Sequence, residues 1–303
     1  MIRGLTAELE LMLAEAGVTG LVPLAAGDDN QVYAACVEGR ELIVKVARTA
    51  KARFGVAAWA AAQLAAVGVP VPTVLCHSDR LLVETRCSGI PLNQLAAATA
   101  SAAGRLLRRI HSVPVRGYGR LDTAGVGVHP TARDWLLQPT QLPATADVDL
   151  HALRAQAINS LRHHLPLLAG VPASLLHGDW AARHVIVEDG GVTGVVDLES
   201  VRGGDPLADL AGWSLQEPAE LTRALYAGYF TTPPDQTIRT RLALYRVRIA
   251  TAMLARHVAK AEHPQLALRT AQLRADLADL ACQQPAAQPR FAPPSSSQEG
   301  PSC

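Results

Sequence analysis

One stretch of the sequence restricts the fold and the chemistry more than any other. His-Gly-Asp at 177–179 is followed by His184, by the apolar run at 185–187 and, after a turn, by Asp197. Two β segments joined by a tight turn would bring Asp179, His184 and Asp197 to one end of a hairpin-like unit. One carboxylate can then face an acceptor hydroxyl while another holds a cation, as phosphoryl transfer requires. A hairpin with solvated acidic turns would explain each carboxylate singly, but not the whole spacing.

Length, charge and cysteine content exclude several classes of protein. The 303 residues are 49% hydrophobic and 18% charged, which is typical of a globular chain with two lobes. The net charge of +1 gives no reason to expect nucleic acid or a membrane surface as a partner. Five cysteines without a CxxC pair argue against disulfides or a zinc site and fit a reducing cytoplasm. No apolar signal core follows the N-terminus.

The stretch between Arg53 and Asp79 carries no Asp, Glu, Lys or Arg and is rich in alanine. A spanning helix needs about 20 strongly apolar residues. This stretch contains Gln63 and meets Gly68 and two prolines. We therefore expect a buried helix at 54–67 and no membrane association.

The pattern of apolar runs and turns predicts two lobes and a tail. The small α+β lobe (1–87) holds that helix, a short helix at 5–16 and strands at 21–26, 31–37, 42–47, 73–76 and 81–84. The segment 88–91 resembles a hinge. The large lobe (88–282) is helical at 92–112, 150–170 and most of 206–281, irregular at 113–147, and has β segments at 175–177, 185–188 and 192–197. Residues 283–303 are predicted to be a disordered tail.

The central motif resembles the aminoglycoside phosphotransferase family of kinase-like enzymes. That family is marked by His-Gly-Asp, a metal-binding residue five positions on, and a β-hairpin leading to a second Asp. Three further segments are similar to the family: 204–211, 68–72, and 107–111 with 117–119. The resemblance covers roughly residues 20 to 282. It implies an α+β, two-lobed, protein-kinase-like fold, with the nucleotide between the lobes and the acceptor against the large lobe.

The resemblance also assigns roles to individual residues. Asp179 would be the catalytic base, and Asp197 would bind the Mg²⁺ that bridges the nucleotide phosphates, since magnesium prefers oxygen ligands. Glu199 would be an additional or supporting ligand. The remaining residues would support the loop: His177 and Arg183 beside the base, Asp205 as a helix N-cap before Pro206, and Asp209 as a buried brace.

His184 departs from the family, which usually has Asn at this position. Macrolide phosphotransferases, a branch of the family, resemble this chain in carrying His. The imidazole would either ligate the metal through a neutral nitrogen or hold a metal-bound water. Because a protonated imidazole cannot ligate, we expect activity to be sensitive to acid.

Lys45 lies in a predicted strand, where the resemblance places a lysine that contacts the nucleotide phosphates. Kinase-like folds pair this lysine with a helix glutamate, but no Asp or Glu lies between Lys45 and Asp79. The lysine either works unpaired or meets an acid from elsewhere. The preceding turn has one glycine, Gly27, and no GxGxxG. Asn30 would shape this turn or donate to a phosphate.

The strand at 82–87, with Glu84 and Arg86, would offer backbone groups to the nucleotide base. Backbone contacts do not distinguish ATP from GTP; the macrolide branch is associated with GTP. Trp180, next to the base, is a candidate wall of the acceptor pocket.

The charge of the C-terminal helices indicates the chemical class of the acceptor. An enzyme for polycationic aminoglycosides should line its pocket with carboxylates. Between 236 and 281, however, eight basic residues face only three acids. The basic residues are Arg239, Arg241, Arg246, Arg248, Arg256, Lys260, Arg269 and Arg274. This balance favours a neutral, weakly charged or anionic acceptor, such as a macrolide, a nucleoside-type antibiotic or a sugar acid.

The sequence thus predicts an O-phosphotransferase that acts on an antibiotic or small metabolite. Two alternatives stay open: a housekeeping kinase for a sugar, choline-like or homoserine-like alcohol, and a pseudokinase that binds nucleotide without catalysis. The missing helix glutamate and His184 motivate the pseudokinase, whereas intact Asp179 and Asp197 oppose it. The sequence specifies neither the acceptor nor the oligomeric state.

Overall fold

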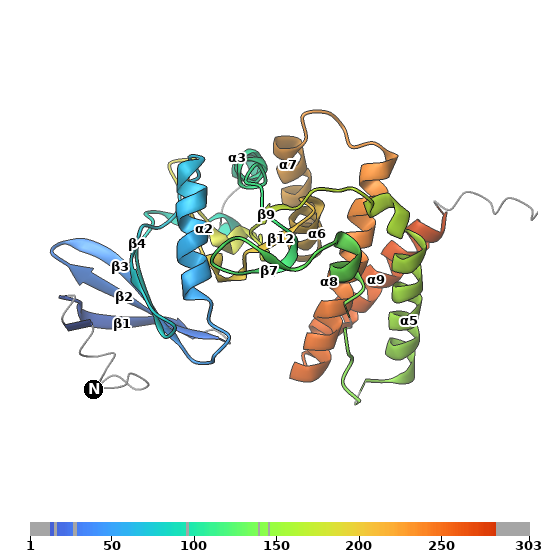
Figure 1. The fold of residues 1–303 in the computed structure, drawn as a ribbon, viewed down its shortest axis with the longest axis horizontal. Helices are drawn as coiled ribbons and strands as arrows, with labels where there is room; N and C mark the ends of the chain where they lie inside the picture. Colours follow the sequence, from blue (N-terminus) through green and yellow to red (C-terminus); the bar gives the residue numbers. More distant parts are fainter. Residues whose placement is uncertain are drawn as a thin grey trace, which may run out of the picture.

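The computed structural model describes residues 13–14, 17–26, 29–94, 97–138, 140–144 and 146–282. Two lobes lie side by side: a strand-rich lobe at the left of Figure 1 and a larger helical lobe at the right. Gly27, the predicted tail 283–303 and most of the helix predicted at 5–16 lie outside the described residues.

The small lobe is built on a five-stranded antiparallel sheet in the order β1-β2-β3-β5-β4. Its strands are β1 (Thr19–Ala26), β2 (Asn30–Val37), β3 (Arg40–Ala47), β4 (Val74–His77) and β5 (Leu81–Thr85). All five predicted strands are present to within a few residues. Alternation along β3 places Val44 and Val46 in the small-lobe core and turns Lys45, between them, to the other face.

The helix α2 (Phe54–Ala66) forms where the uncharged stretch predicted it. Its buried side chains, among them Phe54, Ala60 and Leu64, join the core of the large lobe rather than that of the small-lobe sheet. Within the described ranges, no helix has the length and apolarity needed to cross a bilayer. The absence of charge therefore reflects burial between the lobes.

The large lobe combines helices with two small sheets, β11-β10-β6 and β8-β7-β12-β9. Its strands are β6 (Ile90–Pro91), β7 (Tyr118–Leu121), β8 (Gly127–His129), β9 (Ser174–Leu176), β10 (Val185–Glu188), β11 (Gly191–Val195) and β12 (Arg202–Gly204). Its helices are η1 (Leu92–Gln94), α3 (Ala97–Ile110), α4 (Ala132–Leu136), α5 (Val148–His163), η2 (Leu165–Leu168), η3 (Ala182–His184), η4 (Leu198–Ser200), α6 (Leu207–Gln216), α7 (Ala219–Tyr229), α8 (Gln236–Lys260) and α9 (His263–Cys282).

Two expectations for the large lobe need correction. Residues 113–147 were expected to be irregular, but they contain β7, β8 and α4, because β7 pairs with the distant strand β12. The strand expected at 192–197 ends at Val195, so Asp197 follows it in a left-handed conformation. In Figure 1 these short sheets lie between the small lobe and the helical bundle.

Arg53, at the start of α2, ties the lobes together. Its guanidinium donates to the carbonyls of Glu199 and Val201, each at 3.1 Å, and to that of Leu121. These carbonyls belong to the large lobe, so one cation satisfies three backbone acceptors across the boundary.

We expect Arg53→Ala to destabilise the protein by about 1.5–3 kcal/mol, because it removes hydrogen bonds from a charged group. Urea unfolding measures the change. The exposed Arg80 of the same lobe is the control, and Arg80→Ala should stay within about 0.5 kcal/mol of the parent. Equal losses in the two variants would contradict the assignment.

Candidate active site

The loop at 177–179 is held by a buried carboxylate. Asp209, in the first turn of α6, accepts from the backbone N–H of His177 at 2.8 Å and of Gly178 at 2.9 Å. It also contacts His111 Nε2 at 3.1 Å. Burial opposes ionisation, but these hydrogen bonds hold the pKa of Asp209 below its usual range. The charged carboxylate therefore fixes the backbone on which Asp179 stands.

Gly178 is required by both space and backbone conformation. Its φ is +80°, and an added Cβ would lie 2.1 Å from the carbonyl oxygen of Ser200 and 2.5 Å from Nε of Arg202. Only glycine permits this close approach without displacing the neighbouring segment.

Asp179, His184 and Asp197 converge as the spacing predicted. One potential ligand atom from each lies within 4.8 Å of the other two. His184 Nε2 is 3.4 Å from Asp197 Oδ2, and the two aspartates are only partly buried. Asp197 has a φ of 68°, a left-handed conformation that aspartate tolerates better than most residues. This turn after β11 brings its carboxylate back toward the loop of Asp179.

His184 has one nitrogen engaged and one facing the cluster. Its Nδ1 lies 2.8 Å from the carbonyl oxygen of Asp179, so Nδ1 must carry a proton and donate. Burial, then the neighbouring His177, lowers the pKa of His184 below its ordinary value. The neutral imidazole thus presents the Nε2 lone pair toward Asp197, as a metal ligand would.

Lys45 meets three carboxylates, none of them from α2. Its Nζ lies 2.9 Å from Glu199, 3.3 Å from Glu84 and 3.6 Å from Asp197. Burial disfavours the ammonium, but these acids outweigh burial and raise its pKa. An acid reaches Lys45 from elsewhere, the second of the two alternatives left open by the sequence.

One ammonium does not neutralise three carboxylates. Burial, together with Asp197 and Glu84, raises the pKa of Glu199, whereas Lys45 keeps Asp197 acidic despite burial. Asn30 Nδ2 donates to Glu199 at 3.3 Å. The excess of carboxylate oxygen suits a divalent cation that prefers oxygen ligands, so the donor set fits Mg²⁺.

The strand at 82–87 corresponds to β5 and the two residues that follow it, and its role in offering backbone groups to the nucleotide base stays a prediction. The side chain of Glu84 is buried and lies 3.3 Å from Lys45, on a central strand that pairs with β3 and β4. The N–H of Arg86 donates to the carbonyl of Glu41, and its guanidinium lies 3.4 Å from the Glu41 carboxylate. Arg86 therefore lies away from the carboxylate cluster.

The other predicted residues lie close to the loop. His177 Nε2 donates to the carbonyl of Val196 at 3.0 Å, and Arg183 donates to Asp179 Oδ2 at 2.8 Å. Asp205 accepts from the N–H of Leu207 at 3.1 Å, as a cap does, and also binds Arg241. Trp180 is almost fully buried and packs edge-on against His177.

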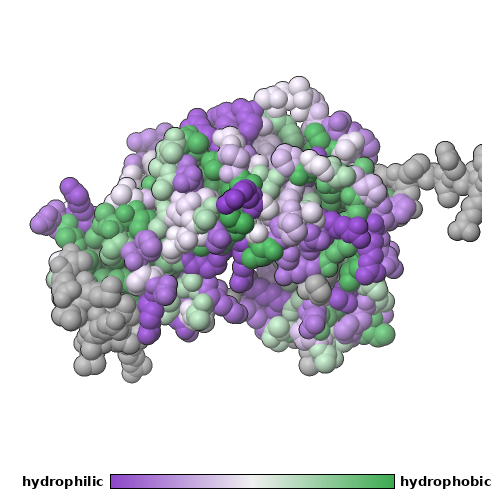
Figure 2. Space-filling model, viewed as in Figure 1, coloured by the Kyte–Doolittle hydropathy of each residue, from purple (hydrophilic) through white to green (hydrophobic). Residues whose placement is uncertain are grey.

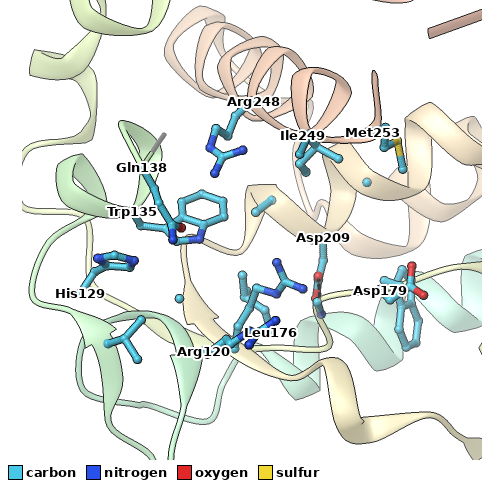
Figure 3. Close-up of a pocket in the computed structure, with 18 of the residues that line it drawn as sticks. Arg120, His129, Trp135, Gln138, Leu176, Asp179, Asp209, Arg248, Ile249 and Met253 are labelled. Atoms are coloured by element: carbon cyan, nitrogen blue, oxygen red, sulfur yellow. Dashed lines mark hydrogen bonds between the residues drawn. The ribbon is translucent and has the colours of Figure 1, made fainter. Parts of the chain in front are cut away.

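A cavity of about 660 Å³ opens beside Asp179 in the large lobe. Figure 3 shows Asp179 at one end and Trp135 and His129 at the other, with Arg248 reaching in from α8. The space-filling view is hollowed in the middle of the face shown, and the hollow is hydrophilic (Figure 2). Trp180 lines this cavity.

Several lining residues escaped the sequence analysis. Arg120 and Arg202 come from strands of three or four residues, which carry no strong periodic signal. Trp135 lies in a segment expected to be irregular. The excess of basic residues at 236–281 did indicate Arg248 and Arg256, which both line the cavity.

The sequence model of the phosphotransferase enzyme family matches residues 20–244, about three quarters of the chain. The chain belongs to this family. A curated relative, the hygromycin-B 4-O-kinase of Escherichia coli, is 22% identical over 250 residues, which cover 77% of this chain and 73% of the relative.

Solved structures share the fold. An aminoglycoside phosphotransferase, APH(4)-Ia, in ternary complex with ADP and hygromycin B is 21% identical, with a TM-score of 0.76, covering 90% of this chain and 98% of that one. A putative fructosamine-3-kinase from Thermobifida fusca is 21% identical, with a TM-score of 0.63, covering 85% and 94%. The GDP complex of an aminoglycoside 2'-phosphotransferase is 17% identical, with a TM-score of 0.65, covering 89% and 95%.

These comparisons confirm the kinase-like α+β fold that the sequence predicted. Membership of the family confirms an enzyme that transfers phosphate to an alcohol group. The roles of the individual residues stay predictions.

We expect Gly178→Ala to cost far more than Gly190→Ala. Both glycines have φ near +80°, but nothing lies within 4 Å of a Cβ added at Gly190. The backbone strain of an alanine is therefore the same at both positions. The clash at Gly178 should lower the free energy of unfolding further, by about 1–3 kcal/mol. Phosphotransferase activity should disappear only in Gly178→Ala. Equal stability and activity in both variants would refute the close approach.

We expect phosphate transfer to fall on acidification, because protonating Nε2 of His184 removes its lone pair. The lowered pKa of His184 places this acid limb below the ordinary range of histidine. A pH–rate profile of His184→Asn should lose the limb, while the exposed His151→Asn should keep it. An unchanged limb in His184→Asn would show that His184 is not the cause.

Proposed function

We propose that this chain transfers the γ-phosphate of ATP or GTP to a hydroxyl of a small-molecule antibiotic, and so confers resistance in the cytoplasm. The convergence of Asp179, His184 and Asp197 within 4.8 Å, at the end of a cavity, carries the proposal. Asp179 faces the acceptor hydroxyl, and Asp197 and His184 bind the cation.

Asp179 is the base that receives the acceptor proton. As the acceptor oxygen forms its bond to the γ-phosphorus, the bond from that phosphorus to the β–γ bridging oxygen breaks, and a nucleoside diphosphate leaves. Arg183, 2.8 Å from Asp179, orients the carboxylate. Magnesium, held by Asp197 and His184, would neutralise charge on the nucleotide phosphates.

The nucleotide binds between the lobes, where β3 presents Lys45. Asn30 and Lys45 both reach Glu199, so the small lobe and η4 share one polar network. Solved relatives of the same fold hold ADP in one case and GDP in another. Both ATP and GTP are therefore candidate donors.

The charges that line the cavity beside Asp179 favour an acceptor that is a neutral, weakly charged or anionic antibiotic, such as a macrolide or nucleoside type. The relatives include enzymes named for hygromycin B and other aminoglycosides. In this chain, however, four arginines line the cavity against two aspartates, the reverse of what a polycation requires.

The alternatives gain less support. A housekeeping metabolite kinase would share the same site, and only the acceptor separates it from an antibiotic kinase. The pseudokinase was motivated by the missing helix glutamate, but Glu84 and Glu199 pair with Lys45 in its place.

We expect mass gain of one phosphate on a member of an antibiotic panel that includes macrolides, nucleosides and kanamycin-type acceptors. The panel is run with ATP and with GTP, with and without Mg²⁺. Asp179→Ala should lower the rate by about 10²–10⁴-fold, since a positioned base contributes that much. The exposed Asp149→Ala should leave it unchanged. Transfer that survives Asp179→Ala would overturn the assignment of the base, and faster turnover of kanamycin-type acceptors would overturn the acceptor class.

A further inference from the structure

The cavity beside Asp179 gathers arginines from three separate elements. Arg120 comes from β7, Arg202 from β12 and Arg248 from α8, and all three line the cavity. In Figure 3 Arg248 and Arg120 lie on opposite sides of the cavity, with Trp135 between them and Asp179 at the far end. Elements distant in sequence thus bring like charges to one space.

Two of these arginines are direct cross-strand partners. Arg120 and Arg202 lie opposite each other in the antiparallel pair of β7 and β12. Like charges in this position repel one another. Burial, partly offset by Asp209 and Asp179, and then Arg120 lower the pKa of the Arg202 guanidinium. The pair carries a cost that a bound anion would remove.

Arg248 has a buried N–H donor, at Nε, that makes no hydrogen bond with the described residues. Its guanidinium lies 5.7 Å from the centre of the Trp135 ring. Burial, then Arg202, lowers the pKa of Arg248. A buried donor without an acceptor is costly unless a ligand supplies one.

The two aspartates that line the cavity, Asp179 and Asp209, form hydrogen bonds with other groups. Asp209 accepts from His177, Gly178 and His111, and Asp179 accepts from Arg183. The positive charge is therefore least balanced around Arg120 and Arg248, away from Asp179. An oxyanion fits the fork geometry of guanidinium groups.

We propose that the acceptor carries an oxyanion, a carboxylate or a phosphate, which Arg120, Arg202 and Arg248 bind while its hydroxyl faces Asp179. This inference rests on the proposed function of the cavity as the acceptor pocket. It narrows the acceptor to an acidic alcohol, such as a sugar acid or a phosphorylated nucleoside, and excludes polycationic aminoglycosides.

The first experiment tests the oxyanion site without catalysis. Sulfate is titrated against the full chain with the nucleotide site saturated by a non-hydrolysable ATP analogue and Mg²⁺, at constant ionic strength in chloride. Thermal stability reports binding. We expect saturable stabilisation whose apparent affinity drops at least tenfold in Arg120→Met and Arg248→Met. The exposed Arg223→Met on α7 is the matched control and should bind like the parent. No saturable effect, or equal effects in all variants, would overturn the proposal.

The second experiment separates the acceptor class from the activity. Galactose, galacturonate and galactosamine share one scaffold with neutral, anionic and cationic substituents, and galactose 1-phosphate tests a phosphate in place of the carboxylate. We expect kcat/KM to be highest for an anionic member, by at least tenfold over galactose. Arg248→Met should lower this preference at least tenfold by raising KM for the anionic member, whereas the exposed Arg223→Met should keep the preference of the parent. Preference for galactosamine would overturn the proposal. If none of the sugars is phosphorylated while sulfate binds as expected, these sugars are not acceptors and the oxyanion site stands on the sulfate titration; the transfer itself is decided by the antibiotic panel.

Discussion

The interaction on which the rest of the site depends is the contact of Lys45 with three buried or half-buried carboxylates. Glu84 belongs to the small lobe, whereas Asp197 and Glu199 follow β11 in the large lobe, so one ammonium joins both walls of the cleft. Because the acids outnumber it, the surroundings of Lys45 keep a negative excess, which under the proposed function would repel phosphate until a cation enters. The same charge balance would couple binding of the nucleotide to binding of the metal.

The helix α2 is apolar because it packs into the core and does not supply the acidic partner of Lys45. A kinase-like helix that supplied the lysine partner would need an acid on the face toward the cleft. Here that face packs into the large-lobe core, and the acid comes from β5 and η4. Arg53 then fixes the start of the helix to the carbonyls of Glu199 and Val201. The lobes are held by packing and backbone acceptors, not by a helix glutamate.

The sequence predicted the features that depend on neighbouring residues, but not the contacts between segments that are distant along the chain. Asp179, His184 and Asp197 were identified because a hairpin of a few residues fixes their separation, and the five small-lobe strands were found from alternation. The contact of Glu84 with Lys45 was missed because it depends on register across two strands. Arg120 and Arg202 escaped because β7 and β12 are too short to show a period and exist only through their pairing. Residue patterns do not encode such contacts unless the register is already known.

The two halves of the site carry opposite charge, and under the proposed function this contrast would separate the transfer chemistry from the choice of acceptor. Around Lys45 and Asp197 the surplus is acidic, which suits a cation and its nucleotide; around Arg120 and Arg248 it is basic. The first half holds the residues assigned to phosphoryl transfer, whereas Arg120 on β7 and Arg248 on α8 line the part of the cavity that lies away from Asp179. Solved relatives at 21% identity share the fold, one of them with hygromycin B bound. Membership of the family therefore specifies the transfer, whereas a likeness in fold alone does not specify the acceptor.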